Sequence, residues 1–262
     1  MSDVSSPMPA VFIGHGNPMN ALGDNRYSRA WRALGDRLPR PRAILSISAH
    51  WYTHGSFVTT SPRPRTIHDF RGFPQPLYEV SYPAPGDPGL AERVRGLLGP
   101  EAVRGDRSWG LDHGSWSVLV HAYPQARVPV VQLSIDADAP GWQHYELGRC
   151  LAPLRDDGVL VIGSGNVVHN LRTMNWDEAA PALPWAQRFN ELVRECLVHS
   201  DHEALCDWHA LDHADQAVPT PDHYLPLLYV IGLQRDAESV SFPVDGIEHG
   251  SVGMLSVVVG GK

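Results

Sequence analysis

The chain has 262 residues, of which 43% are hydrophobic and 19% charged, an ordinary globular composition with enough length for a substantial core. Its 21 basic and 29 acidic residues give a formal net charge of −8. An acidic chain without basic runs is a poor candidate for binding nucleic acid or a membrane surface. Three cysteines without CxxC spacing argue against a disulfide framework and a cysteine zinc site.

The N-terminal sequence and the apolar runs bear on location. The first residues lack the basic region of a signal peptide, and no run approaches the ~20 apolar residues of a membrane span. We therefore expect a cytoplasmic protein, with residues 1–8 as a flexible N-terminal tail. The sequence shows no interface motif, so it leaves the oligomeric state open.

Hydrophobic periodicity and turn residues predict strands and helices along the chain. In chain order they predict strand 9–14, helix 24–38, strand 42–49, helix 86–99, strand 128–135, helix 141–155, strand 158–165, helices 184–199 and 220–233, and two strands, SVSFPV and SVGMLSVVV, near the C-terminus. Asp24 is the expected N-cap of the first helix and Thr220 that of the last, with Pro221 at its first position. The proline- and glycine-rich residues 61–88 predict a long ordered loop, a feature that is often functional.

The alternation of strands and helices predicts the fold class. It is typical of an α/β protein in which a mostly parallel central sheet carries helices on both faces. The composition shows no break along the chain, so we expect a single domain over residues 1–262. Ligands of such sheets bind at the carboxyl ends of the strands. The residues that follow each predicted strand are therefore the first candidates for function.

Histidines stand at these strand ends. His15 and His50 close the first two predicted strands, and His169 follows the strand at 158–165 by a few residues. His223 is the third residue of the predicted helix at 220–233, where the helix dipole disfavours an imidazolium. A neutral imidazole is the form that binds metals. His113 is expected in a loop between Asp112 and a glycine.

The residues alone leave two interpretations of these histidines open. They can form a metal site that the fold assembles, or they can cap strands and bond to the backbone. Ser164 lies in IGSGN, which lacks the first glycine of a nucleophile elbow, so a serine hydrolase is disfavoured. The chain also lacks a GxGxxG or Walker A loop after a strand.

Seven segments together resemble one family. In the same order along the chain, they are similar to the DOPA-dioxygenase branch of the class III extradiol ring-cleaving dioxygenases: FIGHGNPMNALGDNRYSRAW, SAHW, TIHDFRGFPQPLYEVSYPAPG, WGLDHGSWSVL, PVVQLSID, GSGNVVHNLR and PTPDHYLPLLYVIG. The similarity runs from about Pro9 to DGIEHGSVGM, essentially the whole chain. Asn17 and Gly253 depart from the family pattern, which bears on fine substrate contacts.

The resemblance implies a single-domain α/β fold and a mononuclear non-haem metal centre. It implies that His15, His50 and His223 are metal ligands. His169 would be the catalytic acid/base or a fourth ligand, and His113 would line the substrate pocket and help to transfer protons. Non-haem iron oxygenases often use two histidines and a carboxylate. Asp222 and Glu248 are the carboxylates that we consider as substitutes for His223.

The reaction that the resemblance implies is ring opening of a catechol, such as L-DOPA, by O2 to a muconic semialdehyde. Fe(II) would be the working ion, and Zn²⁺, which has no redox chemistry, would be able to occupy the same site. His169 would take the second catechol proton, which suits an imidazole with its own pKa of about 6.5.

The substrate ring needs aromatic or apolar contacts. Trp51 and Tyr224 stand beside motif histidines, and we predict that they stack on the substrate ring, the alternative being that they belong to the core. Two other functions stay open from the sequence: a zinc-dependent hydrolase that uses the same histidines, and a non-catalytic relative that binds small aromatic molecules. The resemblance does not identify the physiological catechol.

Overall fold

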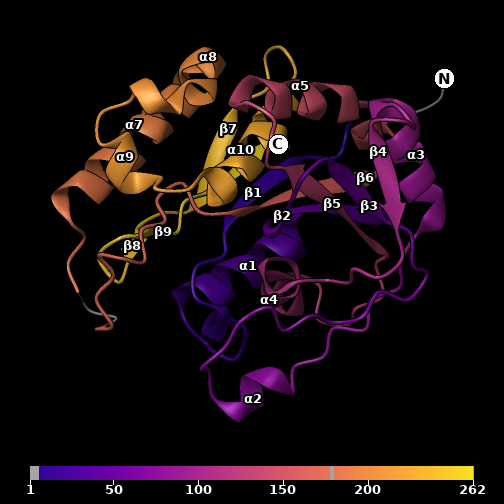
Figure 1. Ribbon diagram of the computed structural model, residues 1–262, viewed down its shortest axis with the longest axis horizontal. Coiled ribbons are helices and arrows are strands. Elements are labelled where there is room, and N and C mark those ends of the chain that lie inside the picture. Colours follow the sequence, from indigo (N-terminus) through magenta and orange to yellow (C-terminus); the bar gives the residue numbers. More distant parts are fainter. Residues whose placement is uncertain (1–5, 178–179, 262) are drawn as a thin grey trace.

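The computed structural model describes residues 6–177 and 180–261, and most of the predicted tail lies outside them. Its centre is an eight-stranded sheet in the order β4-β3-β5-β2-β6-β1-β10-β7 (Figure 1). These strands are β1 (Ala10–Gly14), β2 (Ala43–Thr53), β3 (Ser56–Thr59), β4 (Val103–Asp106), β5 (Val130–Asp136), β6 (Val159–Gly165), β7 (Val240–Val244) and β10 (Ser256–Val259). The short strands β8 (Ile247–Glu248) and β9 (Val252–Gly253) pair separately.

The middle of the sheet is parallel. Strands β5, β2, β6 and β1 all run in the same direction, whereas β10 is antiparallel to β1 and to β7, and β3 is antiparallel to β5. The predicted α/β class with a mostly parallel sheet is therefore confirmed. Because the carboxyl ends of the four central strands lie at one edge, the loops after them meet there.

Helices cover both faces of the sheet (Figure 1). The helical segments are η1 (Pro18–Ala21), α1 (Arg26–Arg37), α2 (Gln75–Tyr78), α3 (Pro88–Leu98), α4 (His113–Ala122), α5 (Gly141–Leu151), α6 (Pro153–Asp156), α7 (Pro184–His199), α8 (His202–Cys206), η2 (Trp208–Ala210), α9 (Ala214–Ala217), η3 (Pro221–His223) and α10 (Leu225–Gly232). Helices α1 and α4 pack on one face, and α3, α5, α7 and α10 on the other. Strand β1 shows the alternation, since Phe12 belongs to one core and Val11 to the other.

One predicted helix cap was wrong, and one predicted helix is divided, although Thr220 and Pro221 stand at its N-cap and first position as predicted. Helix α1 is capped by Asn25, not Asp24, because the Asn25 side chain accepts the backbone N–H groups of Tyr27 and Ser28. The predicted helix at 220–233 is divided into η3 and α10, and Thr220 makes no capping hydrogen bond. Pro226 explains the division, since a proline near the start of α10 has no N–H to continue the preceding turn.

Proline also ends a helix at the other predicted boundary. The helix expected over 141–155 stops at Leu151, and the separate turn α6 begins at Pro153. Strands β3 and β4 and helix α4 were not predicted. Their segments are short or have no clear periodicity; for example, α4 has both histidines and serines among its buried residues.

Candidate active site

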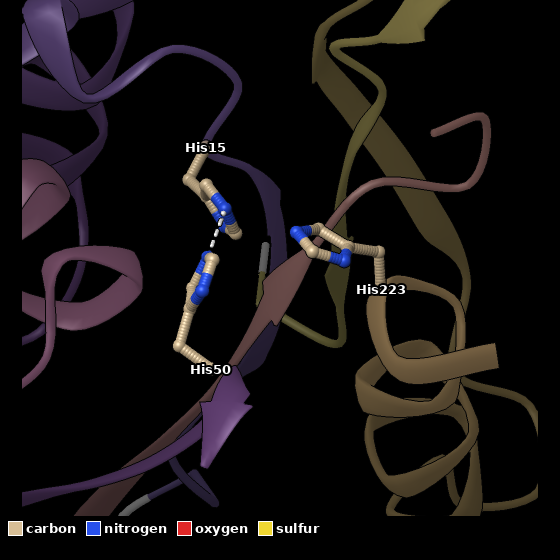
Figure 2. A group of neighbouring side chains, drawn as sticks. All are labelled: His15, His50 and His223. Carbon is tan, nitrogen blue, oxygen red and sulfur yellow. Dashed lines mark hydrogen bonds between the residues drawn. The ribbon is translucent and has the colours of Figure 1, made fainter. Parts of the chain in front are cut away.

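Three histidines from three segments converge at the carboxyl edge of the sheet. His15 directly follows β1, His50 lies in β2, and His223 closes η3. One ring nitrogen from each lies within 4.8 Å of those from the other two. Figure 2 shows the His15 and His50 rings facing each other, with one nitrogen of His223 directed toward them. The sequence prediction that these histidines gather is thus borne out by their positions.

We expected His50 to end its strand, but the strand continues beyond it. Strand β2 continues to Thr53, but its pairing with β6 ends at Ser48 and its pairing with β5 is interrupted between Ile47 and Tyr52. His50 therefore lies in the irregular part of β2. This irregularity allows the imidazole to turn toward the end of β1.

The backbone of His223 approaches the end of β6 very closely. Its carbonyl oxygen accepts the N–H of Asn166 at 2.9 Å, and a Cβ atom on Gly165 would lie only 2.1 Å from that oxygen. Glycine at 165 is required for this approach, because a side chain there would displace η3. The glycine turn after β6 thus places the third histidine beside the first two.

Each of the three rings has a partner at Nδ1. His15 Nδ1 lies 3.0 Å from Ser164 Oγ, and that hydroxyl donates to Gly114 O at 2.5 Å, so His15 Nδ1–H is the donor to Ser164. His223 Nδ1 donates to the Asp222 carboxylate. His50 Nδ1 lies 3.3 Å from Asp69 Oδ2. Such partners fix the imidazole tautomer and leave Nε2 with its lone pair.

The chemistry of this donor set fits a metal ion. Burial, followed by neighbouring imidazoles, holds the pKa values of His15 and His50 well below their usual range, so both rings are neutral. Their Nε2 atoms face each other at 3.1 Å. In the tautomers set by the Nδ1 partners, both carry lone pairs, and a cation between them satisfies both.

His169 and His113 complete a cluster of five imidazoles. The His169 ring stacks on that of His223, with centroids 3.5 Å apart and an interplanar angle of 8°. Its ring nitrogens do not belong to the group within 4.8 Å that His15, His50 and His223 form among the described residues. Burial, and then His223, lowers the pKa of His169 from 6.5 to about 2. This pKa lies below the value of about 6.5 that we expected, and the ring is neutral in this structure.

His113 is not in a loop. It is the first residue of α4, whose N-cap is Asp112. Its ring lies 3.8 Å from that of His50 between centroids, and its Nδ1 lies 2.9 Å from Asp69 Oδ2. The sequence missed Asp69, although it lies in the 61–88 loop that was expected to be functional, directly after a histidine.

The five histidines line one cavity of about 320 Å³. The rest of its wall is formed by Gly16, Asn17, Pro18, Asp69, Phe70, Phe73, Leu171, Met174, Trp176, His249 and Val252. Of these, Leu171 and Trp176 are exposed to solvent. Two larger cavities in the described part of the chain, of about 480 and 650 Å³, are lined by other residues. A small planar molecule entering the first cavity meets imidazoles at its base and apolar groups at its mouth.

Known proteins identify the family. Residues 14–260 match the family described as the catalytic LigB subunit of aromatic ring-opening dioxygenase. The chain belongs to this family. It is 52% identical to the 4,5-DOPA dioxygenase extradiol of Escherichia coli K12, over 98% of this chain and 96% of that relative. The protein of the same name from Beta vulgaris is 40% identical, over 84% of this chain and 85% of that one.

A solved structure agrees with the fold. The crystal structure of an uncharacterized protein from Escherichia coli K12 is 48% identical, with a TM-score of 0.86, and the match covers 97% of this chain and 100% of that one. As a LigB-family member, the protein is an extradiol, aromatic ring-opening dioxygenase. The family implies a small aromatic substrate and O2, and its histidine site fits a metal ion.

Two predicted substrate contacts lie elsewhere in this dioxygenase. Trp51 is buried and stacks on Trp109, with centroids 5.3 Å apart. Tyr224 is wholly buried, and its hydroxyl donates to Leu205 O. Neither lines the cavity that the described residues form, so the geometry does not support ring stacking by them. The aromatic rings of the cavity wall are those of Phe70, Phe73 and Trp176.

The two carboxylates considered as ligands also have other positions. Asp222 accepts from His223 Nδ1. Burial raises its pKa, but hydrogen bonds from His223 and Thr220 outweigh this and lower it to about 2, so it is ionised. Glu248 lines the polar cavity of about 650 Å³.

Among the described residues of this LigB-family chain, none of the helices combines the length and apolarity needed to cross a membrane.

Proposed function

We propose that the protein cleaves an L-DOPA-type catechol at a mononuclear non-haem Fe(II) site held by His15, His50 and His223. The observation that carries this proposal is the convergence of three ring nitrogens within 4.8 Å at the base of the cavity. Relatives named 4,5-DOPA dioxygenase extradiol at 52%, 40% and 34% identity support the substrate class. A metal ion held by these residues would supply a Lewis acid for the catechol and, as Fe(II) but not as Zn²⁺, electrons for O2.

The imidazoles beside the proposed ligands handle protons. His169 lines the cavity, and its ring stacks on that of the proposed ligand His223. We assign it the proton of the second catechol hydroxyl, which it later returns to the ring-opened product. The alternative role of His169 as a fourth ligand predicts instead that its removal releases metal.

The His113 ring takes a second proton-handling position. Its Nδ1 faces Asp69 at 2.9 Å, so Nδ1–H is the donor and Nε2 accepts. His113 lines the cavity on the side of His50, whereas His169 lies beside His223. A catechol seated between them has one imidazole on each side.

Apolar groups hold the substrate ring. Phe70 and Phe73 form an edge-to-face pair, with centroids 5.2 Å apart, in the cavity wall. Trp176 is 77% exposed and Leu171 57% exposed, although both line the same cavity. Exposed apolar side chains at a cavity mouth are unfavourable in water. They gain burial when an aromatic ring enters, and this excludes water from the reacting atoms.

Oxygen uptake tests the proposal. The protein is reconstituted with Fe(II) without air and then mixed with L-DOPA in air, while dissolved O2 and visible absorbance are recorded. The expected result is O2 consumption together with a yellow ring-opened product. With stoichiometric metal and a panel of catechols, a lack of uptake contradicts the proposal and favours a zinc hydrolase or a non-catalytic binder of aromatic molecules.

A further inference from the structure

One carboxylate contacts two of the five imidazoles. Asp69 Oδ2 lies 2.9 Å from His113 Nδ1 and 3.3 Å from His50 Nδ1. Its other oxygen accepts the backbone N–H of His113 at 2.9 Å. We propose that Asp69 is a positioning residue that orients a metal ligand and a proton-transfer group together. This inference rests on the proposed metal site.

The tautomers of both rings follow from the position of Asp69. Asp69 accepts a hydrogen bond from His113 Nδ1, which therefore carries hydrogen, because a carboxylate only accepts. The negative charge of the same oxygen, 3.3 Å from His50 Nδ1, favours the His50 tautomer with hydrogen on that nitrogen. The Nε2 atoms of both rings then hold lone pairs. On His50 that lone pair faces His15, where the metal is proposed to bind, and on His113 it is available to accept a proton in the cavity.

The loop that carries Asp69 is attached to α4. Ile67, two residues earlier, donates its N–H to Leu111 O at 2.7 Å, and its carbonyl accepts from Trp116 Nε1 at 2.8 Å. The ring of Phe70, the next residue, lies edge-on to His113, with centroids 5.5 Å apart. The loop and the first turn of α4 thus hold each other, and Asp69 is fixed relative to His113.

The Nδ1 partners of the other ligands are not shared in this way. His15 bonds to the neutral hydroxyl of Ser164, and His223 bonds to Asp222. Asp222 hydrogen-bonds to one proposed ligand, His223. The charge of Asp69 lies beside one proposed ligand and one proton-transfer ring, so both metal affinity and turnover should fall when it is removed.

The test uses Asp69→Asn, which keeps the shape of the side chain. The amide oxygen still accepts the backbone N–H of His113. The amide nitrogen, which replaces the other carboxylate oxygen, donates toward the Nδ1 atoms of His50 and His113 and so favours the opposite tautomer of each ring. Zn²⁺ affinity is measured by titration calorimetry on metal-free protein, and kcat and KM on Fe(II)-loaded protein. We expect Zn²⁺ affinity and kcat each to fall about 10- to 100-fold, the usual effect of losing an outer partner of a ligand, with a smaller change in KM.

Two further variants separate positioning from a purely structural role. Asp87→Asn removes the charge of the residue that caps α3 by accepting the N–H of Leu90; it is the matched control and should leave Zn²⁺ affinity and kcat unchanged. Trp116→Phe keeps a ring but removes the donor to Ile67 O. It should lower kcat in the same direction as Asp69→Asn, by less.

The outcomes are distinct. If Asp69→Asn lowers only thermal stability, or keeps Zn²⁺ affinity and kcat within twofold of the unsubstituted protein, the positioning role is wrong. If the unsubstituted protein binds Zn²⁺ but consumes no O2 with any catechol, the proposed function fails. The Zn²⁺ titration of Asp69→Asn still decides the role of Asp69 in that case.

Discussion

Two buried histidine regions of this protein differ in one respect. His144, a wholly buried residue of α5, uses both ring nitrogens inside the protein: Nδ1 lies 3.0 Å from Tyr229 Oη and Nε2 3.2 Å from Ala139 O. His15 is as deeply buried, but only its Nδ1 bonds to an ordinary protein partner, Ser164. Its Nε2 faces another imidazole.

The contrast shows that burial alone does not distinguish a ligand from a structural histidine. Burial lowers the pKa of His144 to about 4 and that of His15 well below its usual range, so both rings are neutral. A carbonyl oxygen only accepts, so Nε2 of His144 carries hydrogen and has no lone pair for a metal. The free lone pair on the second nitrogen is therefore the signature of the site.

The largest effect should come from removing a proposed ligand. His15→Ala or His50→Ala takes away one of three imidazoles that converge within 4.8 Å, so bound metal and O2 uptake should be lost together, with activity at background. Metal content by elemental analysis and O2 uptake check this. A variant that keeps stoichiometric metal would show that the removed ring is not a ligand.

The second-largest effect distinguishes a metal ligand from an acid/base residue within the five-imidazole cluster. His169→Ala should retain metal but lower kcat about 10²- to 10⁴-fold, the usual contribution of a general acid/base. Metal content and kcat are measured on the same preparation. Normal turnover would refute the acid/base role, whereas loss of metal would support His169 as a fourth ligand.

Changing the structural histidine should affect stability and not metal binding. His144→Phe leaves the hydroxyl of Tyr229 and the carbonyl of Ala139 without the partners that they have here, so the free energy of unfolding should fall by about 1–3 kcal/mol. Urea denaturation measures the loss. Zn²⁺ stoichiometry should stay unchanged, and a loss of bound metal would contradict the distinction between the two regions.

The smallest expected effect is a change in how stability depends on pH, and it concerns a buried cation with partners inside the protein. Arg155 is 1% exposed and donates to Met8 O, Leu233 O and the Glu238 carboxylate. Burial raises the pKa of Glu238, but hydrogen bonds from Arg155 and Arg235 outweigh this and lower it.

A lowered carboxyl pKa stabilises the fold above the pKa of the unfolded chain, and this contribution is lost as the pH falls through the folded value. The unsubstituted protein should therefore lose more stability than Glu238→Gln between about pH 5 and pH 3. Urea denaturation across this range measures the difference. Parallel pH profiles for the two proteins would show that the ion pair contributes no pH-dependent stability.

Much of the fold could be predicted from local pattern. Strands β1, β5 and β6 and helix α7 lie within two residues of their expected bounds, since apolar runs and turn residues define them. Strands β3 and β4 were missed because four-residue strands show little periodicity. Trp51 and Tyr224, which we expected to contact the substrate, do not line the cavity that the described residues form, because sequence proximity to a histidine does not say which way a neighbouring side chain points.

By itself, the sequence determined the α/β class, the family resemblance and the histidines His15, His50 and His223 as candidates, because strand ends and glycine turns are local features. Only the tertiary structure decided which nitrogens converge and which residues complete the cavity. The order β2-β6-β1 brings residues 15 and 50 together, and strand order depends on long-range pairing that no local pattern encodes. Asp69 joins them for the same reason, since its loop is held by α4, a helix 44 residues further along the chain at His113.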